Sequence, residues 1–187
     1  MAQAAEWDAL HQRCPECHKA IIYLYVTSAN TWERFMVYPL NASRPIPTEV
    51  PNPYRQDFSE ACTVLSASPK ASAALSRRCV QAVLRDKAGT TKKDLYDQIE
   101  EVVTSGKVPS HISSELHAVR NIGNFAAHPM KSTNTGDIVD VEPGEAEWNL
   151  DVLESLFDFY FVQPAVAAKR KAKLNKKLKE AGKPEIA

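Results

Sequence analysis

Residues 120–128 have the sequence RNIGNFAAH, and this stretch decides how the helical part of the chain is interpreted. Arg120, Asn124 and His128 recur at intervals of four, so on a helix they share one face. Gly123 stands between them, although glycine inside a helix costs about 1 kcal/mol relative to alanine. Close approach of a neighbouring helix offsets such a cost. The stretch therefore predicts a packed helix with a polar face beside the contact.

Two interpretations of this polar face remain open. His117 extends the face toward the N-terminus, and Asn121 lies at its edge. A guanidinium binds phosphate oxygens, a histidine can transfer a proton near neutral pH, and an amide can orient either group. These are the parts needed for metal-independent RNA cleavage, a reaction for which no cofactor is expected. The alternative, which the residue types favour, is a structural hydrogen-bond network across a helix interface.

Helical periodicity extends over most of the chain around this stretch. Apolar residues recur at helical spacing near residues 57–65, 69–85, 91–104, 110–128 and 144–162. Ser68 is a predicted N-cap and Gly106 a predicted helix stop. On the second helix the expected buried stripe is Ala71, Ala74, Leu75, Cys79, Ala82 and Val83. The last helix is apolar over a wide arc, which indicates a central helix or a subunit interface.

The N-terminal part has a different pattern. Residues 20–26 and 32–38 are rich in β-branched and aromatic residues, with turn formers between them, so they predict a β-hairpin. Five of the 12 prolines follow between Pro39 and Pro53, which favours an extended connector. The predicted organisation is a knuckle and hairpin over 1–40, a proline-rich connector over 41–56, a helical bundle over 57–163 and a basic tail over 164–187. GDIVDVEP, residues 136–143, predicts a short strand.

The sequence CPEC at residues 14–17 has the spacing of half a zinc site. Cys14 and Cys17 are the candidate ligands, and His11 and His18 are the nearest residues able to complete the set. Cys62 and Cys79 fall on predicted helix stripes, where a cysteine is most often a core residue. A structural zinc and a metal-free remnant of a zinc ribbon are both compatible with the pattern.

Charge is unevenly distributed along the chain. Of the 23 basic and 23 acidic residues, 8 and 2 fall from Lys169 onward, which leaves 15 and 21 in the remainder. The tail, with Lys169, Arg170, Lys171 and Lys173 at its start, can neutralise phosphates of RNA or DNA; the alternative is a solvated tail. We expect this tail to be at most partly ordered. The chain shows no secretory signal and no apolar run long enough for a membrane span, so a cytoplasmic location and no membrane partner are expected.

The order of these features resembles a bacterial family known as domain of unknown function 4145. The resemblance rests on CPEC, YP at 38–39, SEA at 59–61, ASAALSRRCVQAVL at 71–84, RxxGNxxxH at 120–128 and Glu-Ala at 145–146. That family is similar to the HEPN superfamily of helical bundles, whose ribonucleases dimerise and place an arginine and a histidine from each subunit in a shared cleft. The matching positions are Arg120 and His128, with Asn121 after the arginine. Seven residues separate the two, more than in the HEPN pattern.

Taken together, the sequence predicts a mainly α protein: a HEPN-like bundle of about five helices behind a small zinc-ribbon-like β-hairpin, as a homodimer. The first functional hypothesis is an RNA-directed effector or endoribonuclease in phage defence, with Arg120, Asn124 and His128 as catalytic residues. Arg77 and Arg78 are then candidate phosphate contacts. The second is a non-catalytic nucleic-acid-binding or dimerisation module acting as an adaptor in a defence or restriction system.

Overall fold

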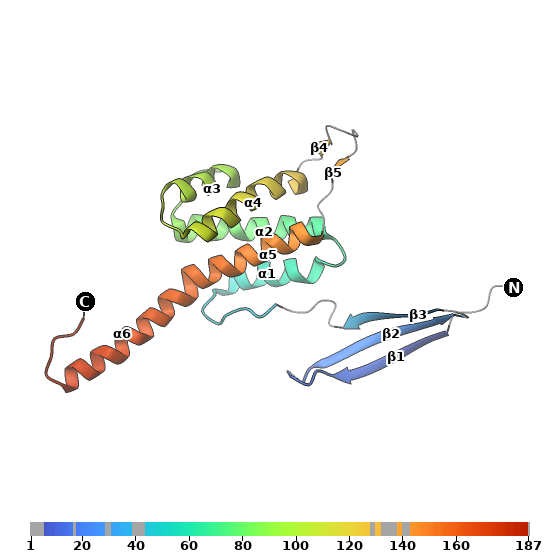
Figure 1. Ribbon diagram of the computed structural model, residues 1–187, viewed down its shortest axis with the longest axis horizontal. Helices are drawn as coiled ribbons and strands as arrows, with labels where there is room; N and C mark the ends of the chain where they lie inside the picture. Colours follow the sequence, from blue (N-terminus) through green and yellow to red (C-terminus); the bar gives the residue numbers. More distant parts are fainter. Residues whose placement is uncertain are drawn as a thin grey trace. The chain divides into compact units, whose positions relative to one another are not determined.

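The computed structural model describes residues 6–16, 18–28, 31–38, 44–127, 130–131, 138–139 and 143–186. For residues 28, 31, 121–127, 130–131, 138–139 and 143 the backbone alone is described. The chain divides into two compact units, Met1–Arg44 and Pro45–Ala187. The first contains a small antiparallel sheet and the second a group of helices (Figure 1).

Three antiparallel strands make up the described part of the first unit, in the order β1-β2-β3. They are β1 (Glu6–Arg13), β2 (Ala20–Ser28) and β3 (Thr31–Tyr38). The two strands expected from the apolar runs are confirmed. β1 was not predicted, because EWDALHQR contains a single aromatic residue and no β-branched one. Its pairing with β2, from Glu6 opposite Thr27 to Arg13 opposite Ala20, supplies the order that its composition does not.

The second unit confirms the predicted helical character. Its elements are α1 (Asn52–Val64), α2 (Pro69–Val83), η1 (Leu84–Ala88), α3 (Leu95–Thr104), α4 (Ser110–Ala127), β4 (Met130–Lys131), β5 (Ile138–Val139), α5 (Pro143–Phe157), η2 (Asp158–Val162) and α6 (Gln163–Glu180), where η1 and η2 are π-helical turns. β5 confirms the short strand expected near residue 138. The connector expected over 41–56 is wrong for its last residues, because α1 begins at Asn52. Pro53 occupies the first turn of α1, where a missing N–H costs little.

Two predicted helix boundaries are confirmed by their geometry. The Ser68 hydroxyl accepts a hydrogen bond from the Ala71 N–H at 3.2 Å and so caps α2. Gly106 has φ +64°, the left-handed conformation that ends α3 and that other residues adopt reluctantly. The start of α2 and the end of α3 are therefore set by local sequence signals.

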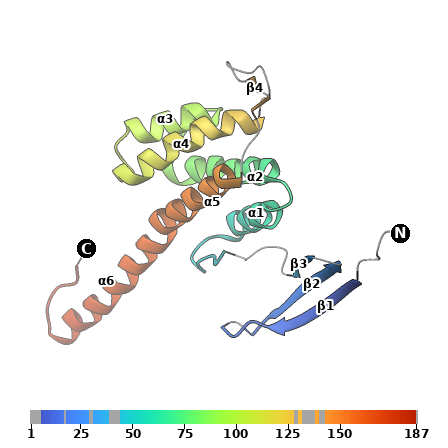
Figure 2. The same cartoon turned by 45° about the vertical axis from the view of Figure 1, so that its right-hand side comes forward.

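Aromatic rings of α1 and the α5–η2 segment form the centre of the core. The rings of Phe58 and Phe157 are 5.5 Å apart, those of Tyr54 and Phe161 5.4 Å, and those of Phe157 and Phe161 6.2 Å. All four residues are buried. α5 contacts α1, α2 and α4, which confirms a central position for this helix (Figure 2).

The buried face of α2 differs from the predicted stripe. Cys79 and Val83 are buried as expected, but Ala74 is exposed. Ser72, Ala73, Ser76 and Val80 are buried instead. The Ser76 hydroxyl donates to the Ser72 carbonyl at 2.8 Å, which satisfies it without any partner outside the helix. Small side chains let α2 approach its neighbours closely, and Ala73 packs against Ala146 of α5.

The helix expected near residues 144–162 is present as α5 and η2, and it continues directly into α6. In η2 the Gln163 N–H donates to the Asp158 carbonyl, five residues back. This wider turn resets the hydrogen-bond ladder, so Pro164 stands in the first turn of α6, where its missing N–H is tolerated. α5, η2 and α6 therefore follow one another without a break. In both views α6 extends beyond α1–α5, and the partly ordered tail that we expected is a helix as far as Glu180 (Figures 1 and 2).

Candidate nucleic-acid interface

Arg120 projects from α4 toward α3 and is held there by two contacts. Its Nη1 donates to Glu100 Oε2 at 2.5 Å, and its guanidinium carbon lies 4.4 Å from the centroid of the Tyr96 ring. Tyr96 and Glu100 are one helical turn apart on α3, so they form a single receiving surface. The Arg120 Nε is buried and has no acceptor among the residues that the structure describes. The guanidinium is thus partly satisfied by protein groups, and Nε is its buried donor without a described acceptor.

Of the other candidate site residues on this face, only His117 is described with its side chain. It is half-buried on α4, one turn before Arg120. Asn121 and Asn124 lie on the α4 backbone, but their side chains fall outside the described residues, as does the whole of His128. The predicted catalytic arrangement of Arg120, Asn124 and His128 therefore stays a prediction.

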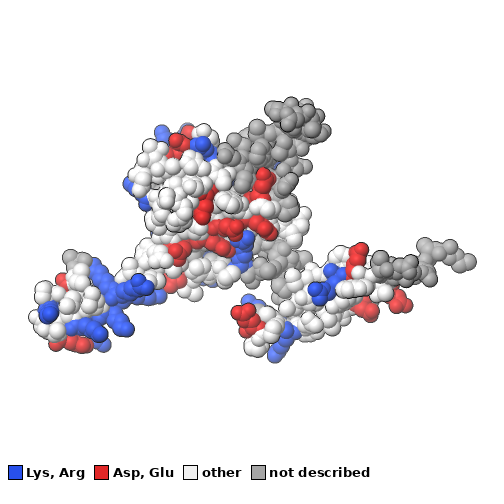
Figure 3. Space-filling model, in the orientation of Figure 1, with Lys and Arg blue, Asp and Glu red and all other residues white. Residues whose placement is uncertain are grey.

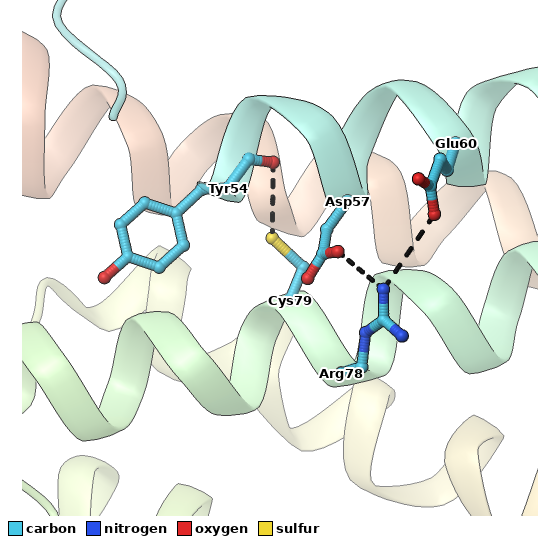
Figure 4. Close-up of polar contacts among 5 residues, drawn as sticks. All are labelled: Tyr54, Asp57, Glu60, Arg78 and Cys79. Atoms are coloured by element: carbon cyan, nitrogen blue, oxygen red, sulfur yellow. Dashed lines mark hydrogen bonds and ion pairs between the residues drawn. The ribbon is translucent and has the colours of Figure 1, made fainter. Parts of the chain in front are cut away.

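Arg78, a predicted phosphate contact, is neutralised by carboxylates of α1. Its Nη2 lies 2.6 Å from Asp57 Oδ1 and 3.9 Å from Glu60 Oε2 (Figure 4). The hydrogen bond that Arg78 donates to Asp57, together with the charge of that carboxylate, raises the pKa of Arg78 above its ordinary value. Beside this pair, the buried Cys79 thiol donates to the Tyr54 carbonyl at 3.7 Å, and burial raises its pKa to about 12. Cys79 is thus a core residue, as predicted, and Arg78 fastens α2 to α1.

Arg77 has a different environment from its neighbour. It is half-buried, its Nη1 has no acceptor in the described part of the chain, and burial lowers its pKa. Within the described residues no carboxylate pairs with it, and none of the hydrogen bonds or ion pairs there joins Arg77 or Arg78 to Arg120. Arg77 and Arg78, the two candidate phosphate contacts on α2, therefore differ in their surroundings, because carboxylates of α1 pair with Arg78 and no described carboxylate pairs with Arg77.

α6 carries the largest set of exposed cations. It contains seven basic residues and one acidic residue, Glu180, and none of its residues is buried. At 100° per residue, five of them fall within an arc of about 120°. This α6 cationic face consists of Lys169, Arg170, Lys173, Lys176 and Lys177. Lys171 and Lys179 lie outside the arc. The basic side chains are seen at the free end of α6 in Figure 3.

One residue of the α6 cationic face is paired. Lys169 Nζ lies 3.2 Å from Glu49 Oε1, so this ion pair joins α6 to the segment that precedes α1. A backbone hydrogen bond and the Lys169 contact lower the pKa of Glu49. In the described part of the chain, the other four cations of the face have no carboxylate within ion-pair distance. Lys176 and Lys177 were missed as site residues, although the helical spacing of the lysines would have found them.

The candidate zinc ligands lie around the turn between β1 and β2. The Cys14 N–H donates to the Lys19 carbonyl and the His18 N–H to the Cys14 carbonyl, both at 2.9 Å. His18 has φ +56°, a conformation rare for residues other than glycine. His11 is exposed on β1, and Cys17 lies outside the described residues. Among the residues that are described, no three metal-binding side chains form a cluster. The zinc site stays a prediction, to be tested by metal analysis of wild type beside Cys14→Ser.

The helices were also compared with the requirements of a membrane span. None of those in the described ranges combines the necessary length with a sufficiently apolar composition.

Comparison with known proteins gives a single result. A family model described as "Domain of unknown function (DUF4145)" matches residues 59–180. The match begins within α1 and ends at the last residue of α6, so α6 falls inside the shared region. No curated protein and no solved structure matches the chain.

Proposed function

The chain belongs to the DUF4145 family, and we propose that it is an RNA-binding protein that contacts the phosphate backbone through the α6 cationic face. The observation that carries this proposal is the contrast between two groups of cations. Arg78 and Arg120 are paired with carboxylates on neighbouring helices. Arg170, Lys173, Lys176 and Lys177 are exposed, lie on one side of a helix and have no acidic partner among the described residues.

This geometry fits backbone contacts better than base recognition. Phosphates along a strand are regularly spaced, and flexible lysines reach them without a fixed orientation. The α6 cationic face has no aromatic residue on which a base could stack. Binding through α6 is therefore independent of sequence and weakens with salt.

A charge-matched comparison tests the proposal. The test variant replaces Arg170, Lys173, Lys176 and Lys177 with glutamine, which preserves helix propensity. The control replaces four exposed cations elsewhere with glutamine: Lys70, Arg85, Lys92 and Lys93. Both proteins lose the same net charge. In fluorescence anisotropy with a labelled single-stranded RNA at low salt, we expect the test variant alone to lose affinity by a factor of ten or more. Equal loss in both variants would reduce the effect to net charge and contradict the proposal.

A second candidate function is RNA cleavage at the face of α4, as a HEPN-like endoribonuclease in phage defence. It is supported by the Arg120 Nε and the Arg77 Nη1, two buried guanidinium N–H groups without an acceptor. A phosphate oxygen satisfies such donors well. The Glu100 carboxylate occupies Nη1 of Arg120, so substrate phosphate must compete with it. A homodimer that places two such faces in one cleft would complete the site with a second set of residues.

Cleavage is tested by incubating total RNA with wild type and with the Arg120→Ala/His128→Ala variant. We expect fragments from wild type alone. Glu100→Gln, which weakens the competition for Arg120, should increase the rate. Identical RNA profiles from all three proteins would remove the nuclease and leave a binding or adaptor role, and light scattering would show whether the chain dimerises.

A further inference from the structure

A groove lies where the continuous segment α5–η2–α6 extends beyond the other helices, on the side of the second unit where α4 begins. Its volume is about 650 Å³, within the range of about 300–1,000 Å³ typical of small-molecule sites. The lining comes from four parts of the second unit: η1, the loop after α3, η2 and the first turn of α6. The described lining residues are Lys87, Ala88, Lys107, Phe159, Tyr160, Gln163, Pro164 and Ala167.

Both π-helical turns of the described chain contribute to this groove. η1 supplies Lys87 and Ala88, and η2 supplies Phe159 and Tyr160. π-helical turns are rare and are frequently found at functional sites. Since η1 and η2 both line this groove, the two π-helical turns determine its shape.

The lining combines positive charge with aromatic surface. Lys87 and Lys107 are exposed, and no carboxylate stands among the described lining residues. The Phe159 and Tyr160 rings pack edge to face with centroids 4.8 Å apart, and both are only partly buried. Lys87 Nζ lies 4.8 Å from the centroid of the Phe161 ring, which holds the lysine beside the aromatic residues. Such a site offers charge to an anion and a flat surface to a ring.

We propose that this groove binds a phosphorylated ligand that carries a planar ring, with the phosphate at Lys87 and Lys107 and the ring against Phe159 and Tyr160. Nucleoside monophosphates are the simplest members of this chemical class. Gln163 adds a polar group at the rim: its Nε2 donates to both Asp158 carboxylate oxygens, at 3.2 and 3.0 Å, which leaves its Oε1 as an acceptor. Burial raises the pKa of Tyr160, so its phenol stays protonated at neutral pH and remains a donor.

This site is separate from the α6 cationic face and does not rest on the RNA-binding proposal. Ala167, which lines the groove, lies about 160° around the helix from Lys169. Variants of the groove therefore leave the α6 cationic face unchanged, and failure of one proposal is distinguishable from failure of the other.

Calorimetry with AMP as the probe tests the assignment. Adenosine supplies the ring without the phosphate, and inorganic phosphate supplies the anion without the ring. We expect AMP to bind more tightly than either. Lys87→Gln/Lys107→Gln should lower the affinity by about tenfold for each lysine removed, since each makes a charge-assisted hydrogen bond. The control Lys92→Gln/Lys93→Gln loses two exposed lysines of the segment between η1 and α3, and it should bind AMP as wild type does. Thermal melts of both variants exclude a loss of folding.

Two further measurements sharpen the result. The second ionisation of a phosphate monoester has a pKa of about 6, so AMP binding should strengthen as the pH rises from about 5 to about 7.5. Competition with a short RNA, with and without a terminal phosphate, distinguishes a free nucleotide from the end of an RNA strand as the source of the ligand. Absence of AMP binding, or equal binding by wild type and by Lys87→Gln/Lys107→Gln, would overturn the proposal.

Discussion

The salt dependence of RNA binding can be predicted from the ion pairs of α6. The α6 cationic face has five members, and Lys169 is already paired with Glu49, so four remain to contact phosphates. For single-stranded nucleic acid the slope of log K against log salt is about −0.7 for each phosphate neutralised, which gives about −2.8 for four contacts. Between about 50 and about 200 mM salt, affinity should then fall about 50-fold.

Two variants should change this slope in opposite directions. The glutamine variant of Arg170, Lys173, Lys176 and Lys177 should have a slope close to zero. Glu49→Gln releases Lys169 as a fifth contact and should steepen the slope to about −3.5. The slopes are measured by fluorescence anisotropy at four or five salt concentrations with one labelled RNA. A slope that stays near −2.8 in the glutamine variant would refute the reasoning, because the contacts would then lie elsewhere on the chain.

Three other predictions concern the bundle itself. Phe157→Ala should lower the free energy of unfolding by about 3–5 kcal/mol in urea titrations, and the partly exposed Phe159→Ala by clearly less; equal losses would contradict the aromatic core. Burial, followed by the hydrogen bond to Asp86, raises the pKa of Tyr54 from 10.0 to about 12, so its contribution to stability is complete below pH 10 and is lost as the pH rises toward 12. Tyr54→Phe should lose less stability than wild type over that interval, and an unchanged pH profile would show that Tyr54 is not responsible. Asn149 is fully buried and neither amide atom has a hydrogen-bond partner among the described residues, so Asn149→Leu should raise the free energy of unfolding by about 1–3 kcal/mol; a decrease would show that the amide is satisfied in solution.

The sequence predicted those parts of the fold that local chemistry controls. The Ser68 cap and the Gly106 stop follow from residue type and helical spacing. Features that depend on distant partners were not predictable in this way. β1 has little strand propensity and owes its order to pairing with β2. Ser76 of α2 is polar by type and is accommodated in the core because its hydroxyl makes a hydrogen bond within its own helix.

The candidate sites also differ in whether local sequence or distant contacts determine them. The cations of α6 are recognisable from their periodicity, once the segment is known to be helical. The contacts of Arg120 with Glu100 and Tyr96 depend on how α3 packs against α4, and sequence spacing carries no record of that arrangement. The groove combines Lys87, Lys107 and Tyr160 from three separate segments, two of them π-helical, and no motif marks it.

The direction of the α6 cationic face depends on the extra residue that the π-helical turn η2 contains. Deleting a single residue between Asp158 and Val162 would restore an α-helical ladder and rotate everything beyond it by about 100°. Lys169 would then turn away from Glu49, and Pro164 would return to a helix interior, where proline costs about 3 kcal/mol or more. Insertions and deletions at this point of related chains should therefore be rarer than substitutions. The length of the segment, more than its composition, sets where the charges of α6 point.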